Sequence, residues 1–229
     1  MSVFRFLALI IFITTTFGAC GRSDLIRIRL LSPIAEAKKN HAIFSDSTSV
    51  STSKVTTTDP ESSGASLYFL LKSIGLGYTT LTTKIEKEAR NSTNETLIIK
   101  ENTTLVTNFA DLAFGIGENY SLMWGAGVLS GGKLDTSLNY GYSGVTDETL
   151  KHKDLSGHSM FLVLGHHGSG FETLLGYRMN FIKSKFDDSG TKIPSYMGKS
   201  PATGKDVSYE STNISLTTAQ VQLGIGVTF

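Results

Sequence analysis

The sequence predicts an all-β fold in which eight antiparallel strands, connected up and down, close into a transmembrane barrel. Three observations lead to this prediction. Apolar residues alternate with polar or glycine residues in several segments, which is the two-residue period of a strand. The polar faces hold glycine, serine and glutamine with few charges, unlike the outer face of a soluble sandwich. After residue 19, no stretch reaches the roughly 20 consecutive apolar residues of a spanning helix.

The clearest alternating segment is the last one, TTAQVQLGIGVTF. From Thr217 to Phe229 every second residue is threonine, alanine or a large apolar residue, and threonine, glutamine or glycine lies between them. The pattern recurs upstream in 73–80, 109–117, 121–128 and 171–181. Tyrosine and tryptophan border the apolar faces, as in a lipid-facing band with aromatic girdles. Because a strand in hydrocarbon must have every N–H and C=O paired, the sheet has to close on itself.

Composition agrees with a β-rich chain and argues against nucleic-acid binding. The 229 residues include 23 glycines and only 4 prolines, which suits many turns. Charged residues are 18% of the chain and the net charge is +1, against about 25% charged residues in a typical soluble domain. The sequence has no stripe of Lys and Arg that could neutralise the phosphates of a nucleic acid. We therefore expect no nucleic-acid partner.

Residues 1–19 have the layout of a secretory signal. Arg5 precedes an apolar run, and the small residues Gly18 and Ala19 follow it. The stretch FGAC, ending at Cys20, resembles the lipobox of bacterial lipoproteins, although Phe17 stands where that motif usually has leucine. Lipidation of Cys20, ordinary cleavage near Ala19 and a free thiol therefore remain open.

The strands are counted by parity, because such barrels have an even number, short periplasmic turns and longer outer loops. Six strong strands are expected, with short turns at 118–119 and 167–169 and long loops at 85–102, 143–155 and 186–210. The segment 120–142 is kept whole, since splitting it at Gly131 and Gly132 would give an odd count. The six strands are 66–84, 103–117, 120–142, 156–166, 170–185 and 211–229.

Two further strands are needed, because the smallest barrels of this class have eight. We expect them in 24–58, where DLIRIRLL alternates and AIFSDSTSVSTSKVTTT is rich in Thr, Ser and Val. The sequence thus divides into a signal at 1–19, an N-terminal segment at 20–64 and the barrel at 65–229. A flexible tether is the alternative for 20–64.

The C-terminal stretch resembles the recognition segment of Gram-negative outer-membrane barrels, which end in phenylalanine preceded by alternating apolar residues. The matching positions are Val221, Leu223, Ile225, Val227 and Phe229. The resemblance implies that this strand is presented to the outer-membrane barrel assembly machinery.

The remaining polar residues favour a lumen network over a catalytic or metal site. We expect no cofactor and no metal, since five histidines lack a matched set of carboxylates. An eight-stranded interior is usually filled by side chains, so a wide pore is not expected, although the many lumen glycines allow a thin water path. The expected network comprises Asp111, Glu172, Arg178, Gln220 and Gln222.

One cluster, GHHGSGFE, gives an enzymatic alternative. It holds His167, Ser169 and Glu172, and outer-membrane lipid hydrolases use a histidine, a serine two residues later and an orienting group. However, GSG is turn chemistry, and the longer motif of those hydrolases, a serine followed by Asn-Gly or Asn-Ala, is absent. We therefore favour a turn here.

The chain as a whole is similar to the small OmpX, OmpA-barrel and OmpW-like group of bacterial outer-membrane proteins. That resemblance implies a non-enzymatic role in membrane structure, in surface interaction through protruding loops, or in passage of small hydrophobic molecules through a lateral opening. The expected partners are outer-membrane lipids and the assembly machinery, and the expected state is a monomer. Two alternatives remain: a lipid hydrolase using Ser169 and His167, and a soluble periplasmic β-sandwich lipoprotein tethered by Cys20.

Overall fold

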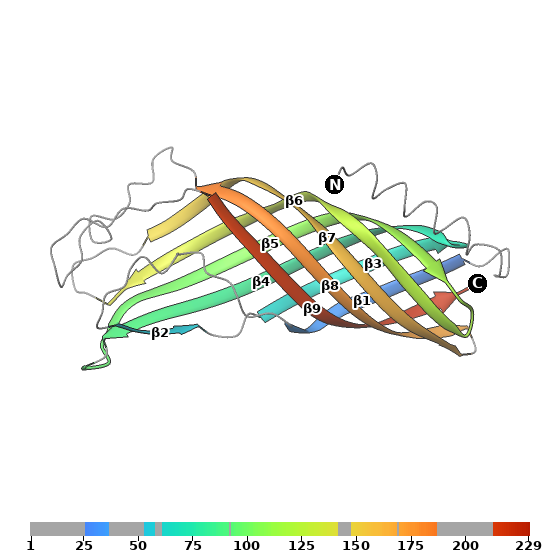
Figure 1. Ribbon diagram of the computed structural model, residues 1–229, viewed down its shortest axis with the longest axis horizontal. Coiled ribbons are helices and arrows are strands. Elements are labelled where there is room, and N and C mark those ends of the chain that lie inside the picture. Colours follow the sequence, from blue (N-terminus) through green and yellow to red (C-terminus); the bar gives the residue numbers. More distant parts are fainter. Residues whose placement is uncertain are drawn as a thin grey trace, which may run out of the picture.

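The computed structural model describes residues 26–36, 53–57, 61–91, 93–141, 148–168, 170–186 and 213–229, which form nine strands (Figure 1). All strand pairings are antiparallel. The strands are β1 (Ile26–Glu36), β2 (Ser53–Thr57), β3 (Glu61–Leu71), β4 (Ile74–Asn91), β5 (Leu97–Ile116), β6 (Tyr120–Tyr140), β7 (Glu148–Gly168), β8 (Phe171–Phe186) and β9 (Asn213–Thr228).

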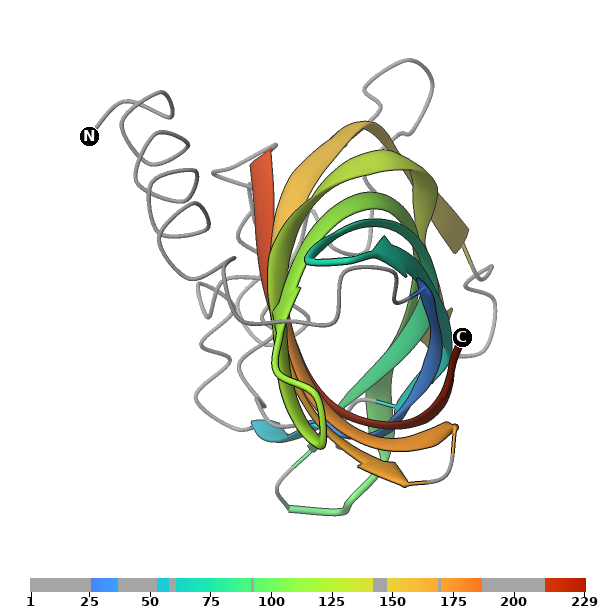
Figure 2. The ribbon, with the colours of Figure 1, turned by 90° about the vertical axis from the view of Figure 1, so that its right-hand side faces the viewer.

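Eight of these strands form a closed ring, as the sequence predicts. Its order is β1-β3-β4-β5-β6-β7-β8-β9, and β9 pairs back to β1. Ile26 and Phe229 close the ring by exchanging two backbone hydrogen bonds of 3.1 and 2.9 Å. Seen along its axis, the sheet encircles the lumen (Figure 2). The ninth strand, β2, lies outside this order and pairs with residues 87–91 of β4.

The two ends of the barrel differ in their connections. Residues 72–73, 117–119 and 169–170 make short connections at one end, where β1 begins and β9 finishes. The connections 37–60, 92–96, 141–147 and 187–212 meet the other end. In barrels of this kind the short turns and both chain ends lie on the periplasmic side, so the longer connections lie on the outside.

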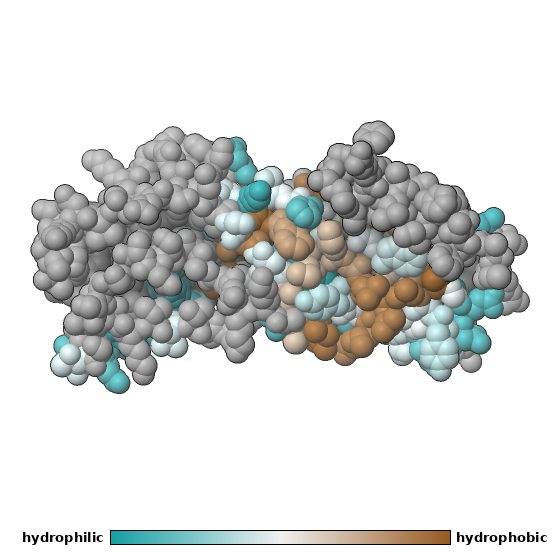
Figure 3. All heavy atoms as spheres, viewed as in Figure 1, coloured by the Kyte–Doolittle hydropathy of each residue, from teal (hydrophilic) through white to brown (hydrophobic). Residues whose placement is uncertain are grey.

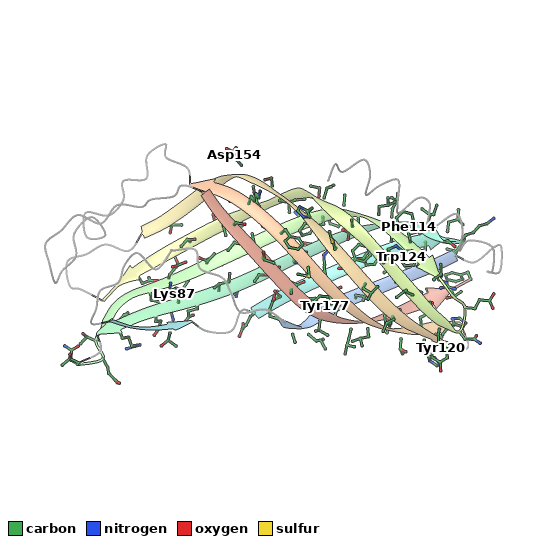
Figure 4. The ribbon with its side chains drawn as sticks, in the orientation of Figure 1. Lys87, Phe114, Tyr120, Trp124, Asp154 and Tyr177 are labelled. Atoms are coloured by element: carbon green, nitrogen blue, oxygen red, sulfur yellow. The ribbon has the colours of Figure 1, made fainter. Side chains whose placement is uncertain are left out.

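Side chains alternate between lumen and exterior along the eight ring strands, and the exterior carries an apolar belt near the short-turn end. The belt includes Ile28, Leu30, Leu67, Phe69, Leu71, Ile74, Leu76, Tyr78, Leu112, Val128, Met160, Leu162, Leu164, Phe171, Leu175, Tyr177, Leu223 and Ile225, all exposed. Figure 3 shows part of it as the brown surface. Figure 4 places Tyr120 at the short-turn end, Tyr177 midway and Lys87 in the opposite half.

Several strands continue past the belt, and we call the part of the barrel within the belt the stem and the part beyond it the collar. The collar comprises 84–91 of β4, 97–105 of β5, 133–140 of β6 and 148–156 of β7. Its exterior carries ion pairs, with Lys100 bonded to both Glu86 and Glu88 and Lys133 bonded to Asp135. The long strand β6 is unbroken at its glycines, which confirms the prediction for 120–142.

The expected single strand at 66–84 is wrong, because it is a hairpin. Lys72 and Ser73 form a two-residue turn between β3 and β4, and Lys72 has a φ of 58°. The exterior face switches parity there, from Leu67, Phe69 and Leu71 to Ile74, Leu76 and Tyr78. Such a switch is what a two-residue hairpin produces, because both strands must keep their apolar side chains outward.

The N-terminal segment supplies one ring strand rather than two. Residues 26–36 form β1, so this part of 20–64 is barrel rather than tether. The second expected strand is present only as β2 at 53–57, and β3 takes its place in the ring. The loops expected at 85–102 and 143–155 are also too long, since β4 runs to Asn91, β5 begins at Leu97 and β7 begins at Glu148. Residues 1–25, with the expected signal and Cys20, lie outside the described residues.

Candidate functional site

Arg178 is the centre of a polar cluster that crosses the lumen of the stem. Its guanidinium makes a two-pronged ion pair with Asp111, with Nη1–Oδ2 and Nη2–Oδ1 distances of 2.9 Å each. It also donates to Thr79 Oγ1 (3.0 Å), Tyr68 Oη (3.1 Å), Ser159 Oγ (2.5 Å) and Asn180 Oδ1 (3.0 Å). The side chains of Arg178 and Asp111 are fully buried. Every prong of the arginine fork therefore meets an acceptor, as a buried cation requires.

The local sequence makes room for this pair. Asp111 on β5 lies opposite Gly77 on β4 and opposite Gly127 on β6. A Cβ added at Gly127 would stand 2.0 Å from Asp111 Oδ1 and 2.6 Å from Ser159 Oγ. The ring of Phe109 lies 4.8 Å from the guanidinium carbon and that of Phe161 lies 5.4 Å from it, so two aromatic faces cover the cation.

A second polar cluster lies in the lumen near the short-turn end. Arg29 Nε and Nη2 donate to the two carboxylate oxygens of Glu172 at 2.7 and 2.8 Å, and Nη2 also donates to Ser121 Oγ at 2.7 Å. Arg27 lies beside them, 3.7 Å from Glu172, and donates to the carbonyl of Gly117 at 2.6 Å. Two arginines of β1 thus share one carboxylate of β8.

An apolar layer separates the two clusters. It consists of Leu31, Tyr68, Leu70, Ala113, Met123, Phe161, Val163 and Leu174, all buried. The structure therefore divides the sequence-predicted residues, placing Asp111 with Arg178 and Glu172 with Arg29. Sequence reasoning did not assign a role to Arg27 or Arg29. Their signal was present, since both lie between the outward Ile26, Ile28 and Leu30.

The predicted residues Gln220 and Gln222 belong to a third feature, a seam in the wall between β1 and β3. The β1–β3 ladder ends at Leu31 and Ser66, although the described parts of β1 and β3 continue to Glu36 and back to Glu61. Pro33, which has no amide proton, lies at a bulge on β1, and Gly64 on β3 has a φ of 132°. We use the word seam for 32–36 of β1 and 61–65 of β3.

Side chains bridge the seam where the ladder is missing. Ser62 donates to Glu36, and Gln220 Nε2 donates to Ser62 Oγ at 3.0 Å and to Glu36 Oε1 at 3.3 Å. Below them, Gln222 Nε2 donates to Ser66 Oγ at 3.4 Å. Among the described residues, Glu36 Oε2, Gln220 Oε1 and Gln222 Oε1 are buried acceptors without a donor. Each such acceptor costs about 1–3 kcal/mol, so the seam is a less satisfied part of the wall than the ladders beside it.

Above the Arg178 cluster the lumen is first lined by apolar side chains and then, further from the stem, by polar ones. Leu105, Phe109, Leu134, Ile182 and Leu216 form a buried cluster with Leu129 and Leu155 packed against it. Further out, Glu101 is 6% exposed and accepts a hydrogen bond from Thr103 at 3.2 Å. Burial raises the pKa of Glu101 to about 7, against the smaller opposing effect of Lys87.

Of the three residues of the enzymatic alternative, the structure describes His167 and Glu172. His167 lies at the end of β7, and its backbone N–H donates to the carbonyl of Asn119 at 2.7 Å. Both carboxylate oxygens of Glu172 accept hydrogen bonds from Arg29. Ser169 lies outside the described residues.

The described residues contain no group of three or more His, Cys, Asp and Glu side chains placed to hold a metal ion. No helix in this part of the chain is long and apolar enough to span a membrane.

The closed ring and its outward apolar belt define the class of protein. Ring closure pairs the backbone along the stem, and the belt presents aliphatic and aromatic side chains to lipid. The chain is an integral membrane β-barrel of the outer-membrane type. A closed single sheet also replaces the alternative of a soluble two-sheet sandwich.

Comparison with known proteins finds structural likeness but no sequence relative. No protein-family model and no curated protein matches the sequence. Among solved structures, the outer membrane protein OprG from Pseudomonas aeruginosa is similar, with a TM-score of 0.45 and 9% sequence identity over 91% of this chain and 97% of that chain.

Proposed function

We propose that this protein is a non-enzymatic outer-membrane barrel that displays its collar and outer connections for interaction at the cell surface. The stem is an anchor, and the strands that continue beyond the belt carry a charged exterior into the aqueous phase. The assembled protein has outer-membrane lipids as its immediate partners, and we expect it to be a monomer.

The observation that supports this role is the filled lumen. The Arg178 cluster, the apolar layer below it and the Leu105 cluster above it are packed from opposite walls of the ring. Such an interior leaves a rigid rod rather than a wide pore. Planar-bilayer recordings of the purified protein should therefore show no stepwise conductance, and regular single-channel steps would contradict the proposal.

Surface display is tested by labelling intact cells. In a Cys20→Ser background, Asn102→Cys in the collar should react with a membrane-impermeant maleimide, whereas Leu112→Cys in the belt should not. Asn102 and Leu112 lie on the exterior of the same strand, β5, so the pair is matched for local structure. Equal labelling of both variants would remove the distinction between collar and stem.

Passage of small apolar molecules through the wall is a second candidate, and the seam is the observation that favours it. There, side chains hold the wall together in place of a ladder. A disulfide between Glu36→Cys and Ser62→Cys, in a Cys20→Ser background, should lock the seam. If passage occurs here, oxidation should slow entry of an apolar fluorescent dye into cells and reduction should restore it. Unchanged entry would reject this route.

We further propose that the last strand is the assembly signal. Leu223, Ile225 and Phe229 are exposed on the outward face of β9, where another protein can reach them before the ring closes. Replacing Phe229 with Ala should lower the fraction that migrates as a heat-modifiable barrel on gels. The matched control is Thr228→Ala, one position away on the other face. Equal assembly of both variants would contradict the signal.

A further inference from the structure

The apolar belt is not equally tall around the barrel. On β8 the exterior positions from Phe171 to Phe181 are apolar or threonine, and a strand tilted by about 40° advances roughly 2.5 Å per residue along the axis. This wall therefore offers about 25 Å of apolar height, the usual height of the band. On the opposite wall, β4 is apolar outside only from Ile74 to Tyr78, which is about 10 Å by the same geometry.

A patch of hydroxyl and amide side chains takes the place of the missing apolar height. In the register of the sheet, Ser63 lies opposite Thr82, and Thr80 lies opposite Asn108. Thr80 and Ser63 are exposed, and Thr82 and Asn108 are half-buried. We call these four residues the hydroxyl patch. It carries no charge, and the first charged side chain above it on β4 is Lys84.

The seam gives an independent reason to place this wall outside hydrocarbon. Over 61–65, the described part of β3 has no ladder on the side that faces β1. A main chain without ladder partners costs several kcal/mol per group in a bilayer core and far less in a hydrated headgroup layer. On the other side of the seam Ile34 is still exposed and apolar, so the change in exterior chemistry occurs at the seam itself.

We propose that the outer boundary of the hydrocarbon lies several ångströms lower against β3 and β4 than against β8 on the opposite wall. The barrel then holds a locally thin patch of bilayer, whose hydrogen-bonding headgroups contact the hydroxyl patch and the seam. The seam then faces headgroups and water, so any passage of apolar molecules through it would start from the headgroup layer rather than from acyl chains. Ser32 Oγ donates to the carbonyl of Gly64 at 3.0 Å, but no ladder pairs the rest of this stretch with β1. Local thinning costs a fraction of a kcal/mol per ångström, which is less than burying main-chain groups that lack ladder partners in hydrocarbon.

Depth-dependent fluorescence quenching tests the proposal, because Trp124 is the only tryptophan of the chain. In a Trp124→Phe background, Thr82→Trp and Met179→Trp place the probe eight residues beyond the first residue of β4 and of β8. In phosphatidylcholine vesicles with bromine at different acyl positions, deep bromines should quench the Trp at 82 at least twofold less than the Trp at 179. Equal quenching at these two positions overturns the proposal.

A tilted barrel would also lift Thr82 out of hydrocarbon, and a third variant separates the two explanations. If the bilayer is thin, Ile74→Trp should lie near the periplasmic boundary and be quenched best by shallow bromines. If the barrel is tilted, the Trp at 74 should be quenched best by deep bromines, and that result also overturns the proposal. Heat-modifiable gel mobility confirms folding of each variant. Thr80→Trp and Tyr177→Trp form a second matched pair should the first not assemble.

Discussion

The stem and the collar are one continuous sheet with opposite chemistry on its outer surface. In the stem the exterior is apolar and the lumen holds two buried ion-pair clusters. In the collar the exterior carries ion pairs such as Lys100 with Glu86, and the lumen holds Leu105 and Leu134. Strand alternation is the same in both parts, and only the residues assigned to each face change.

The difference follows from what surrounds each part. Lipid offers the stem no gain from apolar burial of its exterior, so polar groups gather in the lumen, where each needs a partner. Water surrounds the collar, where burying leucine is favourable as in a soluble protein. Removing a partner should therefore damage the stem most, and removing volume should damage the collar most.

The largest effect is expected from Arg178→Met. The change leaves the buried Asp111 carboxylate without its cation, which typically costs about 3–5 kcal/mol. Denaturant unfolding of the barrel in detergent measures this loss. Adding Asp111→Asn to the same chain should restore much of the stability. If the double variant is as unstable as Arg178→Met alone, the loss of stability does not come from the unpaired Asp111 carboxylate.

In the collar, Leu134→Ala should lower the free energy of unfolding by about 3 kcal/mol, because it opens a cavity in the Leu105 cluster. The control is Lys133→Ala, the neighbouring residue on the solvated face, which should change little. If both variants unfold at the same denaturant concentration as the parent, the collar is not held by its apolar lumen.

Two glycines of β6 lie in different surroundings, Gly127 in the crowded lumen and Gly131 in open space. Gly127→Ala forces a methyl group against Asp111 and Ser159 and should cost about 2 kcal/mol. At Gly131 an added Cβ meets only Asn108 Nδ2, at 3.7 Å, so Gly131→Ala should be neutral within experimental error. If Gly131→Ala is destabilising and Gly127→Ala is neutral, Gly127 does not face the crowded lumen as described.

Glu101 makes the collar sensitive to pH. Its pKa is raised from 4.5 to about 7 by burial, so the folded state holds the proton more tightly than the unfolded state. The stabilisation is complete below about pH 4.5 and is lost as pH rises through about 7, with a change of up to about 3 kcal/mol. Unfolding midpoints at pH 5 and pH 8 measure it. Glu101→Gln should flatten this dependence, and an unaltered profile would assign it to another group.

The smallest effect is expected at the collar exterior. Lys100 bridges Glu86 and Glu88 in water, where such pairs contribute little. Lys100→Ala should therefore leave the unfolding midpoint unchanged at physiological salt. A shift as large as that of Leu134→Ala would show that the exterior ion pairs hold the collar together.

The sequence predicts much of the barrel, and each feature that it fails to predict has a physical reason. Alternation identifies the faces of β5, β8 and β9, because one face must meet lipid. On β6 it holds only to Val128, because a bulge before Gly131 turns the even-numbered residues inward, and Leu134 is buried in the lumen. The hairpin at Lys72 escaped detection because the turn lacks the usual glycine or asparagine, and only the parity switch from Leu71 to Ile74 reveals it.

The partners of each charge were beyond sequence reasoning, since they depend on ring register. Asp111 and Arg178 are 67 residues apart and meet across the lumen, whereas Glu172 meets Arg29 from a strand 143 residues away. The seam has a local signal in Pro33 and Gly64, but its position also depends on the pairing of β1 with β9.

The central claim is a closed ring in which β1 pairs with β9. Ile28 lies opposite Val227, and Leu30 lies opposite Ile225. In a Cys20→Ser background, Ile28→Cys with Val227→Cys should form a disulfide on mild oxidation of the folded barrel. The diagonal pair Leu30→Cys with Val227→Cys should form one poorly, because cross-linking needs Cα atoms within about 7 Å. Cross-linking of the diagonal pair alone, or of neither pair, would contradict the closed ring described.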